Sequence, residues 1–200
     1  MRSSFARSDL LLPGVLLMTI TCPTIEASAA DRQQDLVITE FTPGSADLDW
    51  YVVNDNVMGG RSSGGFNMGQ ETLRFTGHTN TTGGGFSSIR TKAVQLNLSK
   101  FIGIRIRVRG DGRRYTWRLT TDARWRGREV GYWADFETAR DEWRDVAIPF
   151  SDFVPQVRGY RLDGPALEPG RITGMGLMIY DKEDGPFALN LDSVSAYGTE

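Results

Sequence analysis

The sequence predicts an all-β fold, a jelly-roll β-sandwich. Several segments alternate apolar and polar residues with a period of two, whereas no window of about 11 residues shows helical periodicity. Glycine, proline and aspartate separate these segments at short intervals. About nine strands punctuated in this way favour two packed antiparallel sheets.

The clearest strand is "FIGIRIRVRGDG", residues 101–112. Its even-numbered residues from Ile102 to Val108 are apolar, and its odd-numbered residues from Arg105 to Arg109 are arginine. One face is therefore expected to be buried and the other wet. Because "GDG" is typical of a hairpin turn, "RYTWRLTT" (residues 114–121) is predicted to be its antiparallel partner.

The remaining strands are predicted from shorter alternating runs. The segment from Ser151 to Gly170 contains three prolines and is predicted to cross between the sheets, with one helical turn in "PFSDF". The other predicted strands are Leu36–Phe41, Trp50–Val53, Thr72–Thr76, Phe86–Thr91, Gly131–Glu137, Trp143–Ile148, Ile172–Tyr180 and Phe187–Tyr197.

The N-terminus is typical of a secretory signal peptide. Two arginines precede an apolar run, and small residues follow it up to Asp31. The run is too short and interrupted for a membrane anchor. We predict cleavage near Ala29/Ala30, a signal peptide over residues 1–30, one domain over residues 31–200 and a periplasmic or extracellular location. Acylation of Cys22, the only cysteine, is the lipoprotein alternative.

Composition excludes several kinds of site. A net charge of −2 does not favour nucleic-acid binding, and no integral membrane segment remains after signal cleavage. The mature chain would have no cysteine and a single histidine, His78, so thiolate catalysis and Cys/His metal sites lack their ligands. We predict no cofactor and no bound metal.

Two side-chain groups could carry binding or catalysis. Trp133, Asp135 and Glu137 share one face of a strand, so a groove with Trp117 and Tyr132 could hold or hydrolyse a sugar. Alternatively, the two carboxylates form ion pairs with arginines of the wet face. Seven arginines could bind anions or form a solvated face, and those on strands are expected to be adjacent: Arg105, Arg107, Arg109, Arg118, Arg124, Arg126 and Arg128.

The least ordinary stretch is "WYVVNDNVMGGRSSGGF", residues 50–66. Its oxygen-bearing side chains, with "YDKEDG" (residues 180–185) and Asp192, are candidate calcium ligands, but neither stretch has the spacing of an EF-hand loop. Gly65 and Phe66 stand where a P-loop needs lysine and serine or threonine. We therefore expect residues 54–56 to form side-chain-to-backbone turn bonds, and Gly59 and Gly60 to permit close passage of the chain.

Five motifs together resemble the NADH:ubiquinone oxidoreductase complex I intermediate-associated protein family. They are "WYVVNDNVMGGRSSGGF", "GGGFSSIRT", "GIRIRVRGDGRRYTWRL", "WRDVAIPFSDFVPQVRG" and "GMGLMIYDKEDGPFALNLDSVSAY". The resemblance covers residues 46–197 and implies a galactose-binding-like β-sandwich. Its mitochondrial members are assembly chaperones without established catalytic residues.

The function predicted on this basis is a non-catalytic, exported binding module for a protein or a carbohydrate, which could assist assembly of a respiratory or envelope complex. The alternative is a carbohydrate-active enzyme that uses Asp135 and Glu137. The predicted binding residues are Asn54, Asp55, Asn56, Met58, Gly59, Gly60, Arg61, Ser62, Arg118, Trp133 and Asp135.

Overall fold

The computed structural model describes residues 34–69 and 71–198. The predicted signal peptide and Cys22 lie outside the described residues. None of the helices in the described part of the chain has the length and apolarity to cross a membrane. The strands are β1 (Leu36–Thr39), β2 (Tyr51–Asn54), β3 (Ser63–Met68), β4 (Leu73–Thr79), β5 (Ser87–Arg90), β6 (Gly103–Arg109), β7 (Arg114–Trp125), β8 (Arg128–Glu137), β9 (Trp143–Pro149), β10 (Val154–Val157), β11 (Tyr160–Arg161), β12 (Ile172–Ile179) and β13 (Gly185–Tyr197), and the short 3-10 helices are η1 (Asp55–Met58), η2 (Phe150–Asp152) and η3 (Pro169–Arg171).

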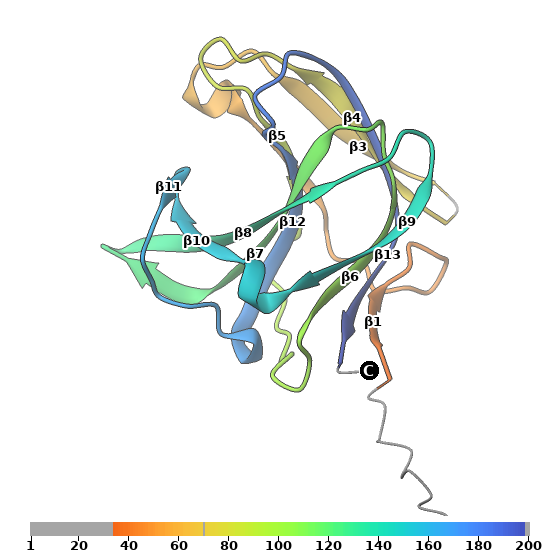
Figure 1. Cartoon of the computed structure of the whole chain (residues 1–200), viewed down its shortest axis with the longest axis vertical. Coiled ribbons are helices and arrows are strands. Elements are labelled where there is room, and N and C mark those ends of the chain that lie inside the picture. The colour runs from red at the N-terminus through yellow and green to blue at the C-terminus, as the bar shows by residue number, and fades with distance from the viewer. Residues whose placement is uncertain (1–33, 70, 199–200) are drawn as a thin grey trace, which may run out of the picture. The chain divides into compact units, whose positions relative to one another are not determined.

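The strands form two antiparallel sheets. The six-stranded sheet has the order β3-β4-β13-β6-β9, with β1 paired to β13, and the seven-stranded sheet has the order β11-β10-β8-β7-β12-β5-β2. The first sheet lies on the right in Figure 1 and the second on the left. The all-β sandwich predicted from the alternation is confirmed.

The core lies between the two sheets. Alternation places Ile104, Ile106 and Val108 of β6 inside, while the arginines between them stay half-exposed. Ile102 departs from this pattern, since it precedes the strand and is exposed. Other fully buried side chains come from both sheets: Leu73, Phe75, Ile89, Tyr115, Trp117, Leu119, Tyr132, Leu177, Ile179, Leu189 and Leu191. Removal of this apolar surface from water is the main stabilising term.

The predicted hairpin between residues 101–112 and 114–121 is wrong. Strand β6 pairs with β9 and β13, whereas β7 pairs with β8 and β12 in the other sheet. The connection between β6 and β7 therefore passes from one sheet to the other. Asp111 holds it in place, because one carboxylate oxygen accepts a hydrogen bond from the backbone N–H of Ala188 at 2.8 Å and both lie within 3.2 Å of the Tyr115 hydroxyl.

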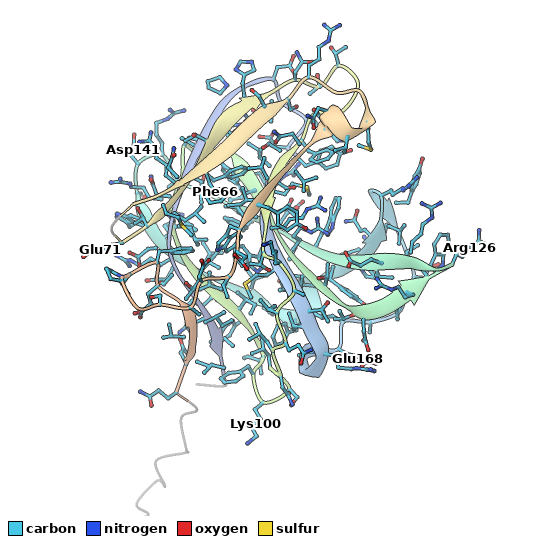
Figure 2. The ribbon with its side chains drawn as sticks, turned by 180° about the vertical axis from the view of Figure 1, so that it is seen from behind. Phe66, Glu71, Lys100, Arg126, Asp141 and Glu168 are labelled. Atoms are coloured by element: carbon cyan, nitrogen blue, oxygen red, sulfur yellow. The ribbon has the colours of Figure 1, made fainter. Side chains whose placement is uncertain are left out.

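The other segments agree with the sequence in position but differ in length. Strands β4, β7 and β8 are longer than predicted, and the hairpin of β7 and β8 carries Arg126 at its projecting tip (Figure 2). The segment 151–170 joins β9 to β12 and so crosses between sheets as predicted, and the helical turn in "PFSDF" is η2. Strands β3, β10 and β11 were not predicted.

Candidate functional site

A row of side chains crosses the outer face of the seven-stranded sheet. Residues directly opposite each other on antiparallel strands point to the same face. The strand register aligns the row as Trp133 on β8, Arg118 on β7, Gly176 on β12, Arg90 on β5 and Tyr51 on β2. Two arginines are thus separated by a glycine and flanked by two aromatic rings.

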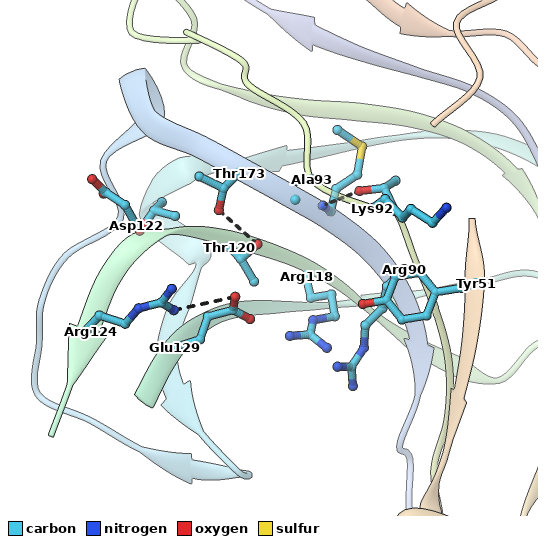
Figure 3. Close-up of a pocket in the computed structure, with 14 residues that line it drawn as sticks. Tyr51, Arg90, Lys92, Ala93, Arg118, Thr120, Asp122, Arg124, Glu129 and Thr173 are labelled. Atoms are coloured by element: carbon cyan, nitrogen blue, oxygen red, sulfur yellow. Dashed lines mark hydrogen bonds and ion pairs between the residues drawn. The ribbon is translucent and has the colours of Figure 1, made fainter. Parts of the chain in front are cut away.

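Two adjoining cavities lie along this row, and we call them together the groove. They have volumes of about 700 Å³ and about 510 Å³. Both are lined by Arg90, Arg118 and Glu129. Figure 3 shows the first cavity, in which the side chains of Arg118 and Arg90 extend in the same direction beside Tyr51.

The second cavity has the more aromatic lining and lies toward η1. Trp133 and Tyr180 meet edge to face with their ring centroids 6.3 Å apart, and Tyr180 meets Phe86 in the same way at 6.3 Å. Val57 and Met58 of η1 also line this cavity, although they are 70% and 61% exposed. The groove therefore joins a charged half to an aromatic half.

Arg118 is the most unusual side chain of the groove. It is only 7% exposed, and it forms neither a hydrogen bond nor an ion pair with any described residue. Burial, with a smaller contribution from the nearby charge of Arg90, lowers the pKa of Arg118 to about 10. The guanidinium group therefore remains protonated at neutral pH.

Gly176 makes room for Arg118 on the sheet surface. A Cβ atom at Gly176 would lie 3.1 Å from Cγ of Arg118 and 2.6 Å from the backbone oxygen of Ile89. The arginine stem therefore lies against the bare backbone of β12. This close approach explains how a long charged side chain becomes buried on the outer face of a sheet.

Asp55 joins three chain segments beside the groove. Its fully buried carboxylate accepts hydrogen bonds from the backbone N–H groups of Ser62 at 2.9 Å and Gly85 at 2.7 Å, and from the Ser62 hydroxyl at 2.6 Å. Phe86 adds a longer backbone bond of 3.3 Å. Burial alone would raise the pKa of Asp55, but these bonds outweigh it and hold the pKa below its ordinary value.

Asn54 and Asp55 do bond to backbone groups, but to groups at least seven residues away, so these are links between segments and not the local turn bonds predicted for residues 54–56. Asn54 donates from Nδ2 to the carbonyl oxygen of Gly64 at 3.1 Å and accepts from the Ser87 hydroxyl at 2.6 Å. The close passage expected at Gly60 is confirmed, because a Cβ atom there would lie 2.3 Å from Cγ of Asp55. These contacts fix the position of η1 at the rim of the groove.

The structure divides the predicted site residues into three groups. Met58, Arg118 and Trp133 meet in the second cavity. Asn54, Asp55, Gly60 and Ser62 form the hydrogen-bonded or close contacts that support η1. Neither cavity of the groove is lined by Asn56, Gly59, Arg61 or Asp135.

The expected carbohydrate groove with two carboxylates is corrected by the strand faces. Trp117 and Tyr132 point into the core and are fully buried, whereas Trp133 points outward. Asp135 shares the outer face but accepts a hydrogen bond from the Thr116 hydroxyl at 2.6 Å and lies 4.0 Å from Nε of Arg114. Glu137 lies opposite Arg114 in the β7–β8 register, also outside the groove.

The expected arrangement of arginines is wrong as well. Arg105, Arg107 and Arg109 lie on the six-stranded sheet, far in topology from Arg118. Arg105 packs over Tyr197, and the other two pack over Trp143, at 5.0 to 5.6 Å from the ring centroids. The ion pairs proposed between these arginines and Asp135 or Glu137 do not form.

The candidate calcium ligands do not converge. Asp181 binds Arg113 through two bonds of 2.7 and 2.8 Å, Asp184 accepts from the backbone N–H of Thr81 at 2.6 Å, and Asp192 lies 3.7 Å from Arg107. Within residues 34–69 and 71–198, no three His, Cys, Asp or Glu side chains gather as a metal site. These carboxylates instead anchor turns and strands.

Several groove residues were not predicted from the sequence. Tyr51, Arg90, Glu129, Met178 and Tyr180 line the cavities, but each belongs to an ordinary strand pattern. One signal was present in "ITGMGLMIY", where Gly174 and Gly176 alternate and leave one face of the strand bare. A bare central strand indicates that neighbouring side chains or a ligand lie across it.

Solved structures with a similar fold include several carbohydrate-binding modules. The family 11 module of a Clostridium thermocellum cellulosomal cellulase superposes with a TM-score of 0.61 at 15% identity, covering 83% of this chain and 95% of that one. A family 30 module gives a TM-score of 0.53 at 12% identity, covering 84% and 90%. At these identities the likeness establishes the fold, a jelly-roll sandwich of galactose-binding-like type.

Sequence comparison gives the family. A mouse mitochondrial protein, complex I intermediate-associated protein 30, is 30% identical over 188 residues, which cover 82% of this chain and 57% of the mouse protein. An uncharacterised protein of Schizosaccharomyces pombe is 31% identical over 172 residues, covering 74% and 77%. The family model for complex I intermediate-associated protein 30 matches residues 39–191. The chain therefore belongs to the complex I intermediate-associated protein 30 family.

Proposed function

We propose that this protein is a non-catalytic, exported binding module that holds an extended glycan in the groove of its seven-stranded sheet. The groove itself carries the proposal, because it joins two cavities of about 700 and 510 Å³ and places Trp133 and Tyr51 at its two ends. Partly exposed aromatic rings offer flat apolar surfaces with little conformational freedom to lose on binding. A structurally similar family 11 module was solved with a β-1,3-1,4-mixed-linked tetrasaccharide, which supports this choice of ligand.

A glycan array followed by calorimetry tests this function. We expect the purified protein to bind at least one oligosaccharide, and Trp133→Ala and Tyr51→Ala each to weaken that binding by about tenfold. Trp143→Ala is the control, because Trp143 packs against arginines of the other sheet. A protein that binds no glycan on the array, or equal losses of glycan affinity in all three variants, would refute a glycan site in the groove.

Export is the second part of the proposal. The apolar run and the small residues before Asp31 support a cleaved signal peptide and a periplasmic or extracellular location. Mass spectrometry of the native protein should find a new N-terminus at Ala30 or Asp31. An intact Met1, or an acylated Cys22, would contradict it.

Protein binding, as in an assembly factor, is the second candidate. It is favoured by the exposed pair Val57 and Met58, which Asp55 and Gly60 hold in a defined position at the groove rim. Exposed apolar residues on a fixed turn are typical of a docking surface. Val57→Ser with Met58→Ser should abolish capture of a cross-linked partner, while Met68→Ser, another exposed methionine, should not. Capture unaffected by the double variant would exclude this surface.

Hydrolysis by Asp135 and Glu137 has less support. Both carboxylates lie outside the two cavities of the groove, and Asp135 is already bonded to Thr116. We expect any bound oligosaccharide to be recovered intact after long incubation, as judged by chromatography. Cleavage that disappears in Asp135→Asn would instead establish the enzyme.

A further inference from the structure

The groove carries more positive than negative charge. Five cationic and two acidic side chains line its two cavities: Arg90, Lys92, Arg118, Arg124, Arg158, Asp122 and Glu129. The whole chain, by contrast, has a net charge of −2. The positive charge is therefore local to this site.

The two acidic residues are already paired with other arginines. Glu129 lies 3.7 Å from Arg124, as the dashed line in Figure 3 marks, and Asp122 is ion-paired with Arg171. Neither Arg118 nor Arg90 forms an ion pair with a described residue, although the more distant charge of Glu129 acts on both. Within the described residues, Arg90 donates from Nε to the Ser88 hydroxyl at 3.3 Å and also bonds to the Tyr51 side chain, whereas Arg118 donates no hydrogen bond.

No protein group among the described residues accepts a hydrogen bond from Arg118, so its guanidinium group is left to bond with whatever occupies the groove. Arg118 is more than nine-tenths buried, and its stem lies against Gly176. A bound anion would supply the missing acceptor. Guanidinium groups are suited to this role, because their planar N–H fork matches two oxygens of one carboxylate.

The spacing of the row suits an anion shared between the two arginines. Arg118 and Arg90 are separated by one strand, so their Cα atoms are about 10 Å apart, and both side chains extend in the same direction (Figure 3). Trp133 and Tyr51 lie next to them in the same row. An anionic group at the centre would therefore have a flat aromatic surface on either side.

We propose that the ligand of the groove is an acidic glycan, in which the carboxylate of a uronic acid residue binds Arg118 and Arg90 while neighbouring sugar rings stack on Trp133 and Tyr51. This inference rests on the glycan-binding function proposed above and names the class of glycan. A single carboxylate matches two arginines near one acidic residue, Glu129, better than a doubly charged phosphate does. The flanking rings have no role in holding a free phosphate.

Calorimetry with matched oligosaccharides tests the inference. The probes are tetramers of galacturonate, mannuronate, guluronate and glucuronate, the methyl esters of those that bind, a sulfated tetrasaccharide, a tetraglutamate peptide and inorganic phosphate. We expect at least one uronate tetramer to bind, its methyl ester to bind at least tenfold more weakly, and affinity to fall with added salt.

Three variants locate the anion. Arg118→Met and Arg90→Met should each reduce uronate affinity at least tenfold and leave methyl-ester affinity within about twofold, whereas Arg74→Met, an exposed arginine on β4, should change neither. The melting temperature of each variant checks that it folds. The melting temperature of Arg118→Met should equal or exceed that of the parent.

The outcomes separate this inference from the proposed function. Equal binding of acid and ester, or uronate binding unaffected by Arg118→Met, would overturn the acidic-glycan site and leave glycan binding intact. Tighter binding of phosphate, the sulfated probe or tetraglutamate would also overturn it, in favour of another anion. A protein that binds no oligosaccharide, acidic or neutral, would overturn both.

Discussion

Arg118 carries its charge in a position where arginine seldom stays without a partner. Because native stability is a small difference between large terms, the partial desolvation of one guanidinium group is a noticeable fraction of it. We expect Arg118→Met, which keeps the length of the stem, to raise the free energy of unfolding by about 1–3 kcal/mol. Denaturant unfolding measures this, with Arg74→Met within about 0.5 kcal/mol of the parent.

The pH dependence of that difference has a defined sign. Burial lowers the pKa of Arg118 to about 10, so the native state binds its proton less tightly than the unfolded state does. The cost is complete at neutral pH and is relieved as pH rises through about 10. The difference in free energy of unfolding between Arg118→Met and the parent should therefore become smaller above that pH. A variant less stable than the parent at pH 7 would contradict this account.

Asp55 has the opposite role. Four hydrogen bonds favour its charged form, so Asp55→Asn, which places an NH₂ group against N–H and O–H donors, should lower the free energy of unfolding by about 2–3 kcal/mol. Because the native pKa is lowered, this stability is present above the ordinary value of 3.8 and is lost as pH falls through the native pKa. Thermal unfolding between pH 7 and 3 measures how the melting temperatures of the parent and of Asp55→Asn approach each other. Asp163→Asn, an exposed aspartate, should have little effect at any pH.

The residue types of Asn54 and Asp55 predict side-chain bonds to backbone groups, and such bonds form. Their partners Gly64, Ser62 and Gly85 lie seven to thirty residues away, so turn chemistry could not name them.

The surroundings of Arg118 could not be predicted, because they depend on Gly176 and Arg90, which are remote in the sequence and adjacent only in the register of three strands. The alternation of apolar and polar residues along β7 shows that Arg118 points away from the core. It does not show that neighbouring side chains bury Arg118 on that outer face.

At the scale of elements, the connection between β6 and β7 shows the limit of turn chemistry. "GDG" predicts a hairpin, yet Arg113 follows it and binds Asp181, the Thr79 hydroxyl and three backbone carbonyls between residues 183 and 186. These long-range bonds fix the crossing between the sheets. Local sequence cannot reveal them, since every partner lies more than thirty residues away in the chain.

Arg113 is therefore expected to be essential to this crossing. The side chains of Arg113 and Asp181 are only 12% and 4% exposed, so Arg113→Met would leave a buried carboxylate unpaired. We expect a loss of about 3–5 kcal/mol in the free energy of unfolding. Arg144→Met, which breaks an exposed pair with Glu142, should cost less than about 1 kcal/mol. Similar losses in the two variants would show that the crossing is held by other contacts.

The three strands that the sequence did not predict, β3, β10 and β11, are edge strands or pair with an edge strand. Strand β3 begins "SGG", and β10 contains Pro155, so neither has the β-branched, alternating pattern of an inner strand. Both lie at or next to the edge of a sheet, where one side needs no partner. The inner strands, in contrast, were predicted correctly because burial on a core face enforces alternation.

At the scale of the whole molecule, the two ends of the described domain are adjacent. Strand β1 pairs with β13, and Leu36 lies opposite Ala196 (Figure 1). A circular permutant that joins the ends through a short glycine-serine linker and opens the chain at Gly127, in the tip of the β7–β8 hairpin, should fold with a melting temperature within about 5 °C of the parent. A permutant opened at Gly176, inside the central strand β12, should not fold, as circular dichroism will show.

Strand β13 is the last of the described strands in sequence order and lies at the centre of its sheet. Until residues 185–197 are available, β4 and β6 have no common neighbour and β1 has no partner. At synthesis rates of about 5–20 residues per second, synthesis through residue 197 takes roughly 10 to 40 seconds, and this sheet cannot close earlier. The topology thus delays closure of this sheet until β13 has been synthesised, and a domain that is still unfolded is the form that the proposed export would require.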